Sequence, residues 1–574
     1  TAPADATAPA STFSAHLANV SGSGDAGGNV SHQEDYAYET LFEYDLLDRV
    51  TQIQYPKEPV ENSRLTTVYR YKCPGVYKVS ASHGAEFSDI VRDVKYNEFG
   101  QIIEITRGNG VVSNYEYDIK GRLANLTTTT SVNGLSHKLQ DVEYSFDVEN
   151  NIKSVENRPE INTESAIHAS VRYDYNYDGL NRLSYAKGVY KRTSISEMLE
   201  ENDIEKKFER GYNYSLSGNL LTKNIFDPDT QNIKDAWNYH YWNHAVNSVD
   251  TSDYGADRFV IRYDAVGNMI SHIDNANNIS KELSYDSSNR IRKVTNPDTG
   301  VVVGRYDYDY SGFRLRKRAL KEIDGEICRV EVLHPSIYFG IESVSSADSE
   351  KNDEDINEDT DEKQYYVVNN IYMNGVRIAA VVPDGKAMYY LTDQVDSVKV
   401  IVDDSGMPVS SMEYLPYGEV WIQEGDNRFS PKYNSQEFDD ETNFYYYNAR
   451  HFDPVISRFV TADSYVPDVM NTQSWNRYSY AFNNPIIYKD PTGHEAILAI
   501  IGTILKEVVV AIVKEVAKKV FKKIVEKVVT EAVKQFAKKA ITAIAKKLPK
   551  KVVTMFKKIG TGMKSKRQTN RILT

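Results

Sequence analysis

The sequence predicts a mainly β fold of repeated hairpins, followed by an α-helical C-terminal region. The first observation is a short recurring phrase: an aromatic residue, an Asp, a few variable residues, a Gly or Asn, often an Arg, and then an apolar residue. Apolar and polar residues alternate beside the phrase, and a long lysine-rich stretch follows residue 503. Clear copies of the phrase begin at Tyr44, Tyr117, Tyr177, Tyr263, Tyr285 and Tyr308.

The spacing of the copies indicates stacked hairpins. Three successive aromatic positions, 263, 285 and 308, lie 22 and 23 residues apart, whereas longer gaps hold insertions. A unit of this length cannot bury its own apolar face and must stack on its neighbours. The alternation in residues 142–146 (VEYSF) is typical of a strand, and Asp with Gly or Asn is typical of a turn. The Tyr and Asp of each copy are therefore interpreted as architectural.

Composition narrows the class of protein. A hydrophobic content of 41% with 42 Tyr excludes a wholly disordered chain. Cys73 and Cys328 are too few for a disulfide framework. Residues 1–34 are rich in Ala, Thr, Ser, Gly and Pro, which predicts a flexible leader. Because the chain begins at Thr1 and has no signal-peptide pattern, we expect a processed or excised piece.

The net charge of −13 conceals two parts of opposite sign. Residues 495–574 hold 20 Lys and Arg against five Glu, whereas the other 494 residues hold 48 basic and 76 acidic side chains. Part of that acidity is a run from Asp348 to Glu362 with nine carboxylates. The run lacks the Gly and ligand spacing of an EF-hand, so we expect a solvated loop in preference to a calcium site. The sequence predicts no metal site and no cofactor.

A dense series of motifs precedes this change of composition. It consists of the segments 391–393 (LTD), 414–418 (YLPYG), 444–450 (FYYYNAR), 452–454 (FDP), 458–459 (RF), 462–463 (AD), 476–478 (NRY), 483–485 (NNP) and 490–493 (DPTG). Together with the repeats, the series resembles the Rhs/YD-repeat proteins and their RHS repeat-associated core. The resemblance covers about residues 36–494.

In that family, repeat hairpins spiral into a shell, the core plugs one end, and a variable C-terminal segment is a polymorphic toxin. The charge division supports the same arrangement, because an acidic shell and a cationic guest attract each other. The resemblance implies five parts: a leader at 1–34, a YD-repeat β-shell at 35–335, an acidic loop and further strands at 336–390, an Rhs-associated core at 391–494, and a basic effector tail at 495–574.

Many members of the family also cut themselves at the end of the core with two aspartates of a DPxG pattern. Paired carboxylates can share a proton, so that one activates water while the other polarises the carbonyl. Asp463 and Asp490 occupy these positions, and the cleavage boundary comprises Gly493, His494 and Glu495. The first DPxG element has lost its Pro and Gly, and His494 stands where Leu usually follows. An inert plug with two turn-forming aspartates is therefore the alternative to autoproteolysis.

The tail alternates two apolar residues with two mostly charged ones, and no Gly or Pro interrupts residues 503–548, which predicts helix. A repeat of four on a helix of about 3.6 residues per turn rotates the apolar pair by about 40° per step. We therefore expect two or more amphipathic helices of about 12 to 20 residues, or one helix enclosed by apolar partners. The side chains expected to bind a membrane are Val508, Val509, Ile512, Val516, Lys518, Lys519, Val520, Phe521, Lys522, Lys523 and Ile524.

The residue types of the tail nearly exclude catalysis within it, because residues 495–574 contain no His, Asp, Cys, Tyr or Trp. A cationic amphipathic helix binds anionic bilayers, with its apolar side in the interface and its Lys side chains outward. Lys506 and Glu507 interrupt the apolar start of the tail before the roughly 18 residues that a membrane span needs. We therefore predict a membrane-disrupting effector. The alternatives are phosphate-directed nucleic-acid binding and a helical tail that docks a partner protein.

The sequence as a whole predicts an Rhs-type toxin carrier that is secreted or delivered at a cell surface. Enzymatic activity other than self-cleavage is not expected. A non-enzymatic surface or adhesion protein is the alternative from another class. The expected partners are the anionic membrane of a target cell, an immunity protein, and an upstream shell fragment or delivery-system protein. Nucleic acid is disfavoured as a partner, because the tail has three Phe as its only aromatic residues.

Overall fold

The computed structural model describes residues 11–16, 37–58, 63–132, 134–160, 169–192, 204–323, 325–346, 364–466, 471–494 and 496–498. The chain divides into two compact units, residues 1–504 and 505–574, and every described residue belongs to the first. The predicted acidic loop, Glu495 and the predicted membrane-binding residues lie outside the described residues. Within the predicted leader, only Ser11–His16 are described; they form strand β1, which pairs with β2.

One antiparallel sheet of 31 strands makes up most of the described chain. Each strand pairs with the next along the sequence, from β1–β2 to β30–β31, so the sheet is one continuous meander of hairpins. This arrangement confirms the predicted mainly β fold of stacked hairpins.

The first half of the meander comprises β1 (Ser11–His16), β2 (Ala37–Tyr44), β3 (Val50–Lys57), β4 (Arg64–Lys72), β5 (Gly75–Ser82), β6 (Ser88–Tyr96), β7 (Ile102–Arg107), β8 (Val112–Tyr117), β9 (Leu123–Val132), β10 (Leu135–Phe146), β11 (Ile152–Asn157), β12 (Ser170–Tyr177), β13 (Leu183–Arg192), β14 (Ile204–Tyr214) and β15 (Leu220–Phe226). The second half comprises β16 (Ile233–Trp242), β17 (Ala245–Thr251), β18 (Ala256–Tyr263), β19 (Met269–Asp274), β20 (Ile279–Tyr285), β21 (Ile291–Thr295), β22 (Val302–Tyr308), β23 (Arg314–Ile323), β24 (Glu326–Ser336), β25 (Phe339–Ser346), β26 (Gln364–Met373), β27 (Val376–Val381), β28 (Ala387–Thr392), β29 (Val398–Val402), β30 (Pro408–Tyr414) and β31 (Val420–Gly425).

Short elements follow the meander and form the rest of the core segment. They are a four-stranded antiparallel sheet, a final strand pair and three short 3₁₀ helices, of which one precedes the four-stranded sheet and two lie between it and the strand pair. These elements are η1 (Tyr433–Ser435), β32 (Glu437–Asp439), β33 (Phe444–Tyr446), β34 (His451–Asp453), β35 (Arg458–Phe459), η2 (Thr472–Trp475), η3 (Ala481–Asn483), β36 (Tyr488–Lys489) and β37 (Ile497–Leu498).

Each recurring phrase forms the same turn. In the copy at Asp178, the carboxylate Oδ1 accepts hydrogen bonds from the amides of Leu180 at 2.9 Å and Arg182 at 3.0 Å. The Arg182 guanidinium returns to Asp178 Oδ2 at 2.7 Å, and Asn181 takes a left-handed φ of 59° that favours Asn or Gly. The Asp, the Asn or Gly and the Arg of the phrase are thus parts of one turn, as the sequence predicts.

The aromatic residue of the phrase joins neighbouring hairpins. Its hydroxyl donates to a backbone carbonyl of the preceding hairpin, as in Tyr177 to Ile152 at 2.7 Å and Tyr308 to Ile291 at 2.9 Å. The same contact is made by Tyr96, Tyr117, Tyr214, Tyr241, Tyr285 and Tyr414. This role requires Tyr rather than Phe and was not predicted from the sequence.

The two edges of the sheet differ. Because every strand reverses direction, turns that follow even-numbered strands share one edge, and all copies of the phrase lie at such turns. The longer connections in the sequence, residues 158–169, 193–203 and 347–363, follow β11, β13 and β25, and these strands end at the opposite edge. One edge therefore carries the uniform turns, and the longer connections join strand ends at the other.

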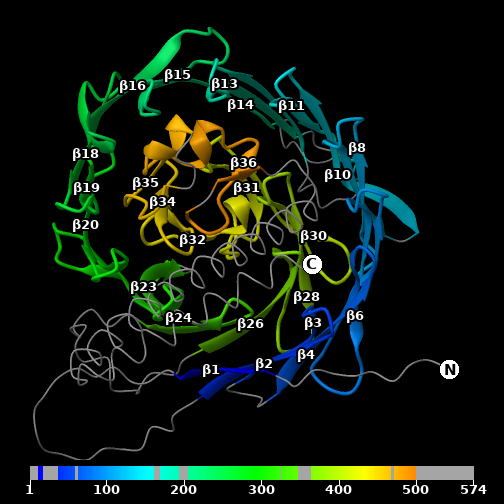
Figure 1. Cartoon of the computed structure of the whole chain (residues 1–574). Helices are drawn as coiled ribbons and strands as arrows, with labels where there is room; N and C mark the ends of the chain where they lie inside the picture. Colours follow the sequence, from blue (N-terminus) through cyan, green and yellow to red (C-terminus); the bar gives the residue numbers. More distant parts are fainter. Residues whose placement is uncertain are drawn as a thin grey trace, which may run out of the picture. The chain divides into compact units, whose positions relative to one another are not determined.

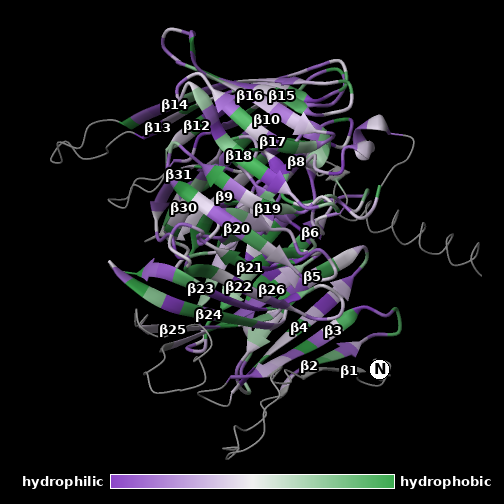
Figure 2. Ribbon diagram, turned by 90° about the vertical axis from the view of Figure 1, so that its left-hand side faces the viewer, coloured by the Kyte–Doolittle hydropathy of each residue, from purple (hydrophilic) through white to green (hydrophobic). Residues whose placement is uncertain are grey.

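The strands bury alternate residues and curve around the core segment. In β4, the inward residues Leu65, Thr67 and Tyr69 alternate with more exposed ones, and Figure 2 shows the matching alternation of polar and apolar residues along the strands. Figure 1 shows the sheet curving around residues 433–494. The first strands also meet late ones, since the Tyr55 hydroxyl donates to the Asn370 carbonyl at 2.9 Å. Buried apolar side chains of the middle of the wall and of the core form one continuous cluster, and those of the first strands form a second cluster with β26–β29.

Candidate functional site

The two aspartates predicted from the sequence lie against one guanidinium at the end of the core. Arg450 Nη2 lies 2.9 Å from Asp463 Oδ2 and 3.5 Å from Asp490 Oδ2. The three side chains are buried, and the guanidinium stacks over the Phe459 ring at 3.6 Å. Burial lowers the pKa of Arg450, and the two carboxylates oppose that change. A buried cation is thus balanced by two carboxylates at one point.

The boundary backbone is held by Asp490 and Arg450. Asp490 Oδ1 accepts hydrogen bonds from the amides of Thr492 at 3.2 Å, Gly493 at 2.8 Å and His494 at 3.1 Å. Arg450 Nε donates to the Gly493 carbonyl oxygen. Gly493 has φ of +77°, and a Cβ there would lie 2.3 Å from the Tyr447 carbonyl oxygen. Only glycine fits this position without displacing backbone.

His494 completes the cluster. Its Nδ1 lies 2.8 Å from Asp463 Oδ1, which also accepts the Tyr465 amide at 3.0 Å. A cavity of about 30 Å³ adjoins these groups, and Arg450, Asp463, Asp490 and His494 are among its lining residues. This volume holds about two water molecules, since one water needs roughly 10–15 Å³. The site therefore combines two carboxylates, a cation, an imidazole and space for water next to His494.

The structure thus brings together four of the predicted boundary residues, Asp463, Asp490, Gly493 and His494. Sequence reasoning assigned no role to Arg450, although it is the one charged residue in the segment 444–450. A single cationic residue in a segment that is aromatic enough to be buried indicates a buried ion pair, because a buried charge needs a partner.

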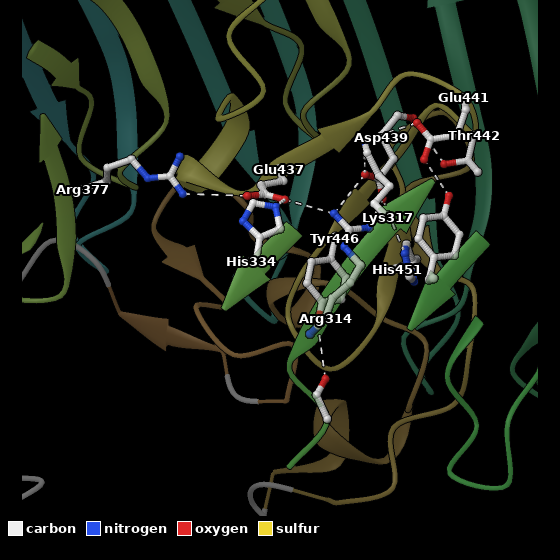
Figure 3. A network of polar contacts seen from close by, with 12 residues as sticks. Arg314, Lys317, His334, Arg377, Glu437, Asp439, Glu441, Thr442, Tyr446 and His451 are labelled. Carbon is white, nitrogen blue, oxygen red and sulfur yellow. Dashed lines mark hydrogen bonds and ion pairs between the residues drawn. The ribbon is translucent and has the colours of Figure 1, made fainter. Parts of the chain in front are cut away.

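A second polar cluster joins the wall of the sheet to the core (Figure 3). Arg314 of β23 forms a bidentate ion pair with Asp439 of β32, with distances of 2.7 and 3.1 Å. Lys317 contacts Asp439 at 3.0 Å and Glu441 at 3.4 Å. Glu437 lies 3.0 Å from Arg314. Nothing in the sequence indicates this cluster, because each of these ion pairs joins residues more than 120 positions apart.

The charges of this cluster balance. Burial alone would raise the pKa of Glu437, but His334, Arg314 and Arg377 lower it to about 2. Burial lowers the pKa of His334 and of His451, which keeps both imidazoles neutral at neutral pH. Three cations, Arg314, Lys317 and Arg377, face the three carboxylates Glu437, Asp439 and Glu441. We interpret the cluster as a structural connection between wall and core.

Among the described residues, no group of three or more His, Cys, Asp or Glu side chains is arranged to hold a metal ion. A separate search of the same ranges for a helix of the length and apolarity that a bilayer requires finds none.

Two family models match the chain. The Teneurin YD-shell model matches residues 371–486, and the RHS Repeat model matches residues 96–136. Both matches lie in the meander and core described above.

Individual proteins extend these matches. Toxin subunit YenC1 of Yersinia entomophaga is 25% identical over 71% of this chain and 43% of its own length. Salivary gland surface protein 1 of Aedes aegypti is 28% identical over 46% of this chain and 8% of its own. The chain thus spans less than half the length of these relatives.

A solved structure matches the described fold. The crystal structure of TcdB2-TccC3-Cdc42 aligns with a TM-score of 0.66 at 20% identity, over 84% of this chain and 23% of that one. A likeness at this identity shows a shared fold. The recurring turns, the core segment and these matches together support an Rhs/YD-repeat protein.

Proposed function

We propose that the chain is a toxin carrier that releases residues after Gly493 by cutting its own backbone. The observation that carries this proposal is the Arg450 guanidinium, which contacts Asp463, Asp490 and the Gly493 carbonyl oxygen together. An inert turn would need Asp490 alone to accept the boundary amides. The additional cation on the carbonyl and the adjacent water-sized cavity support hydrolysis at this bond.

The geometry supports a simple division of roles. Arg450 Nε donates to the Gly493 oxygen and would stabilise the negative charge that develops there during attack. Asp490 holds the amide of His494, which becomes the leaving amine. The aspartates provide carboxylates beside the cavity, where one can take a proton from water. The susceptible bond is then Gly493–His494.

Incubation of the full chain tests the proposal. Intact mass spectrometry should show two products, the second beginning at His494. Asp490→Asn keeps a similar shape but loses the charge that faces Arg450, and we expect it to slow cleavage by about 100-fold or more. Asp404→Asn, away from the boundary, is the matched control and should cleave normally. Persistent full-length mass in the wild type would reject self-cleavage.

Once released, the tail at residues 495–574, which then follows His494, is proposed to disrupt membranes. Support comes from its paired apolar residues and lysines, its excess of 20 basic over five acidic side chains, and its lack of catalytic residue types. Dye release from anionic and neutral liposomes tests this directly. The isolated tail should cause leakage from anionic vesicles, and the intact chain should cause much less. Absence of leakage from a helical tail would favour nucleic-acid binding or partner docking instead.

The relatives suggest how such a carrier would be used. One match is named a toxin subunit, and the matching crystal structure combines TcdB2 with TccC3. We therefore propose that this chain is secreted or delivered, and that another shell fragment or delivery-system protein associates with it. An immunity protein in the producing cell would be a further partner.

A further inference from the structure

His494 departs from the family pattern, and its side chain is part of the boundary cluster. The resemblance predicts Leu at this position, whereas the His494 imidazole lies 2.8 Å from the Asp463 carboxylate. Because an ionised carboxylate only accepts hydrogen bonds, Nδ1 is the nitrogen that carries the hydrogen in the neutral ring. The lone pair is then on Nε2. An Asp that orients a His in this way is a recurrent arrangement in hydrolytic sites.

The cavity beside His494 offers a place for the attacking water. It is about 30 Å³ in volume and is lined by His494 and Ser474, among others. The Ser474 hydroxyl is buried and has no hydrogen-bond partner within the described residues. A buried hydroxyl without a partner is costly, and a bound water would satisfy it. The cavity thus combines a hydroxyl that needs a partner with an oriented imidazole.

We propose that His494 carries the proton during cleavage of the Gly493–His494 bond and that Asp463 positions its imidazole. This inference rests on the self-cleavage proposed above. In place of an aspartate, Nε2 takes a proton from the cavity water while the water oxygen bonds to the Gly493 carbonyl carbon. The resulting imidazolium then returns a proton, relayed by the second water that the cavity can hold, to the His494 backbone nitrogen as the C–N bond breaks. One water is consumed, and the products are a Gly493 carboxyl group and a His494 amino group.

The neighbouring charges are consistent with this role. Asp463 would stabilise the imidazolium, while Arg450, shared between two carboxylates, remains available to the Gly493 oxygen. The titratable and charged groups that line the cavity with His494 are Arg450, Asp463, Tyr465, Arg477 and Asp490.

The test compares the full-length wild type with His494→Asn, because the Asn amide can replace the Nδ1–H donor to Asp463 but cannot carry a proton. Cleavage is followed by intact mass spectrometry. We expect His494→Asn to slow cleavage by about 100-fold. If His494→Asn keeps the bond to Asp463 but still cleaves slowly, the lost rate is due to proton transfer by the imidazole and not to positioning alone. His494→Leu, the residue that the family pattern predicts, is a second variant if the first misfolds.

The outcomes separate this inference from the self-cleavage on which it rests. A wild type that cleaves, with His494→Asn and His494→Leu cleaving at the same rate, would overturn the role of His494 and leave self-cleavage in place. A wild type that stays intact would reject self-cleavage itself and this inference with it. Circular dichroism and thermal unfolding establish that each variant is folded.

Discussion

At the scale of single residues, the chain uses each part of its recurring phrase for a separate bond. Asp178 accepts the amides of its own turn, and Arg182 reaches forward to the Ser215 carbonyl at 2.6 Å. Tyr177 reaches backward to the Ile152 carbonyl. A phrase of a few residues therefore closes one hairpin and joins it to the hairpins before and after it.

Replacing one of these hydroxyls should have a measurable cost. Tyr308→Phe removes the bond to the Ile291 carbonyl and leaves that oxygen without the hydroxyl, and we expect about 1 kcal/mol lower unfolding free energy. Tyr310→Phe is the matched control, because its ring is 94% exposed in the same turn. Urea unfolding monitored by circular dichroism measures both. Equal midpoints for the two variants would mean that the hydroxyl bond adds nothing.

The sequence predicted the turns but not the role of the Tyr hydroxyl. Asp, Asn and Gly act within their own turn, so local spacing reveals them. The partner of Tyr308 is 17 residues away in another hairpin, and only the stacking distance decides whether a hydroxyl reaches it. The same limit explains the boundary site: Asp463 and Asp490 were found from a family motif, whereas their shared contact with Arg450 required the fold.

At the scale of elements, the two edges of the meander should differ in how well they tolerate inserted residues. The turns at the edge that carries the recurring phrase are bonded to each other. For example, Arg290 of one turn donates to the Asp309 carbonyl of the next turn at 2.9 Å. The β15–β16 turn at the other edge, residues 227–232, is made largely by its own Asp227 and exposed residues. Lengthening a flexible loop costs little, since doubling the number of residues raises the free energy of loop closure by only about 0.6 kcal/mol.

Insertions should reveal this asymmetry. A short Gly/Ser segment placed after Thr230 should leave the melting temperature nearly unchanged. The same segment after Ser288 interrupts the Asp286 turn and the Arg290 contact, and we expect it to lower the melting temperature by several degrees. Both sites are exposed, so solvent access does not distinguish them. Differential scanning calorimetry gives the comparison; equal losses at the two sites would contradict it.

At the scale of the whole described unit, the connection between wall and core depends on buried ion pairs. Arg314→Met leaves Asp439 with only Lys317 as its close cation, and we expect a loss of about 3–5 kcal/mol. Arg316→Met on the same strand removes a half-exposed pair with Glu331 at 3.5 Å and should cost at most about 1 kcal/mol. Denaturant unfolding distinguishes the two. Similar small losses would show that the buried pair adds little.

Acid should weaken the same connection. The pKa of Glu437 is lowered to about 2 in the folded chain from an ordinary value of 4.5. The stability that this carboxylate contributes is therefore fully present above the ordinary pKa and is lost as pH falls toward 2. The difference in urea midpoint between wild type and Glu437→Gln should shrink from about pH 5 to about pH 3. A constant difference over this range would exclude the carboxylate as its source.

The strict pairing of each strand with its sequence neighbour limits how such a chain can change length. Removing one strand would reverse the direction of every later strand, so that each following YD turn would move to the edge that now carries the insertions. Removing two consecutive strands preserves the direction of all the others. The hairpin, rather than the strand, is thus the smallest piece that can be gained or lost while the remaining turns keep their bonds to one another.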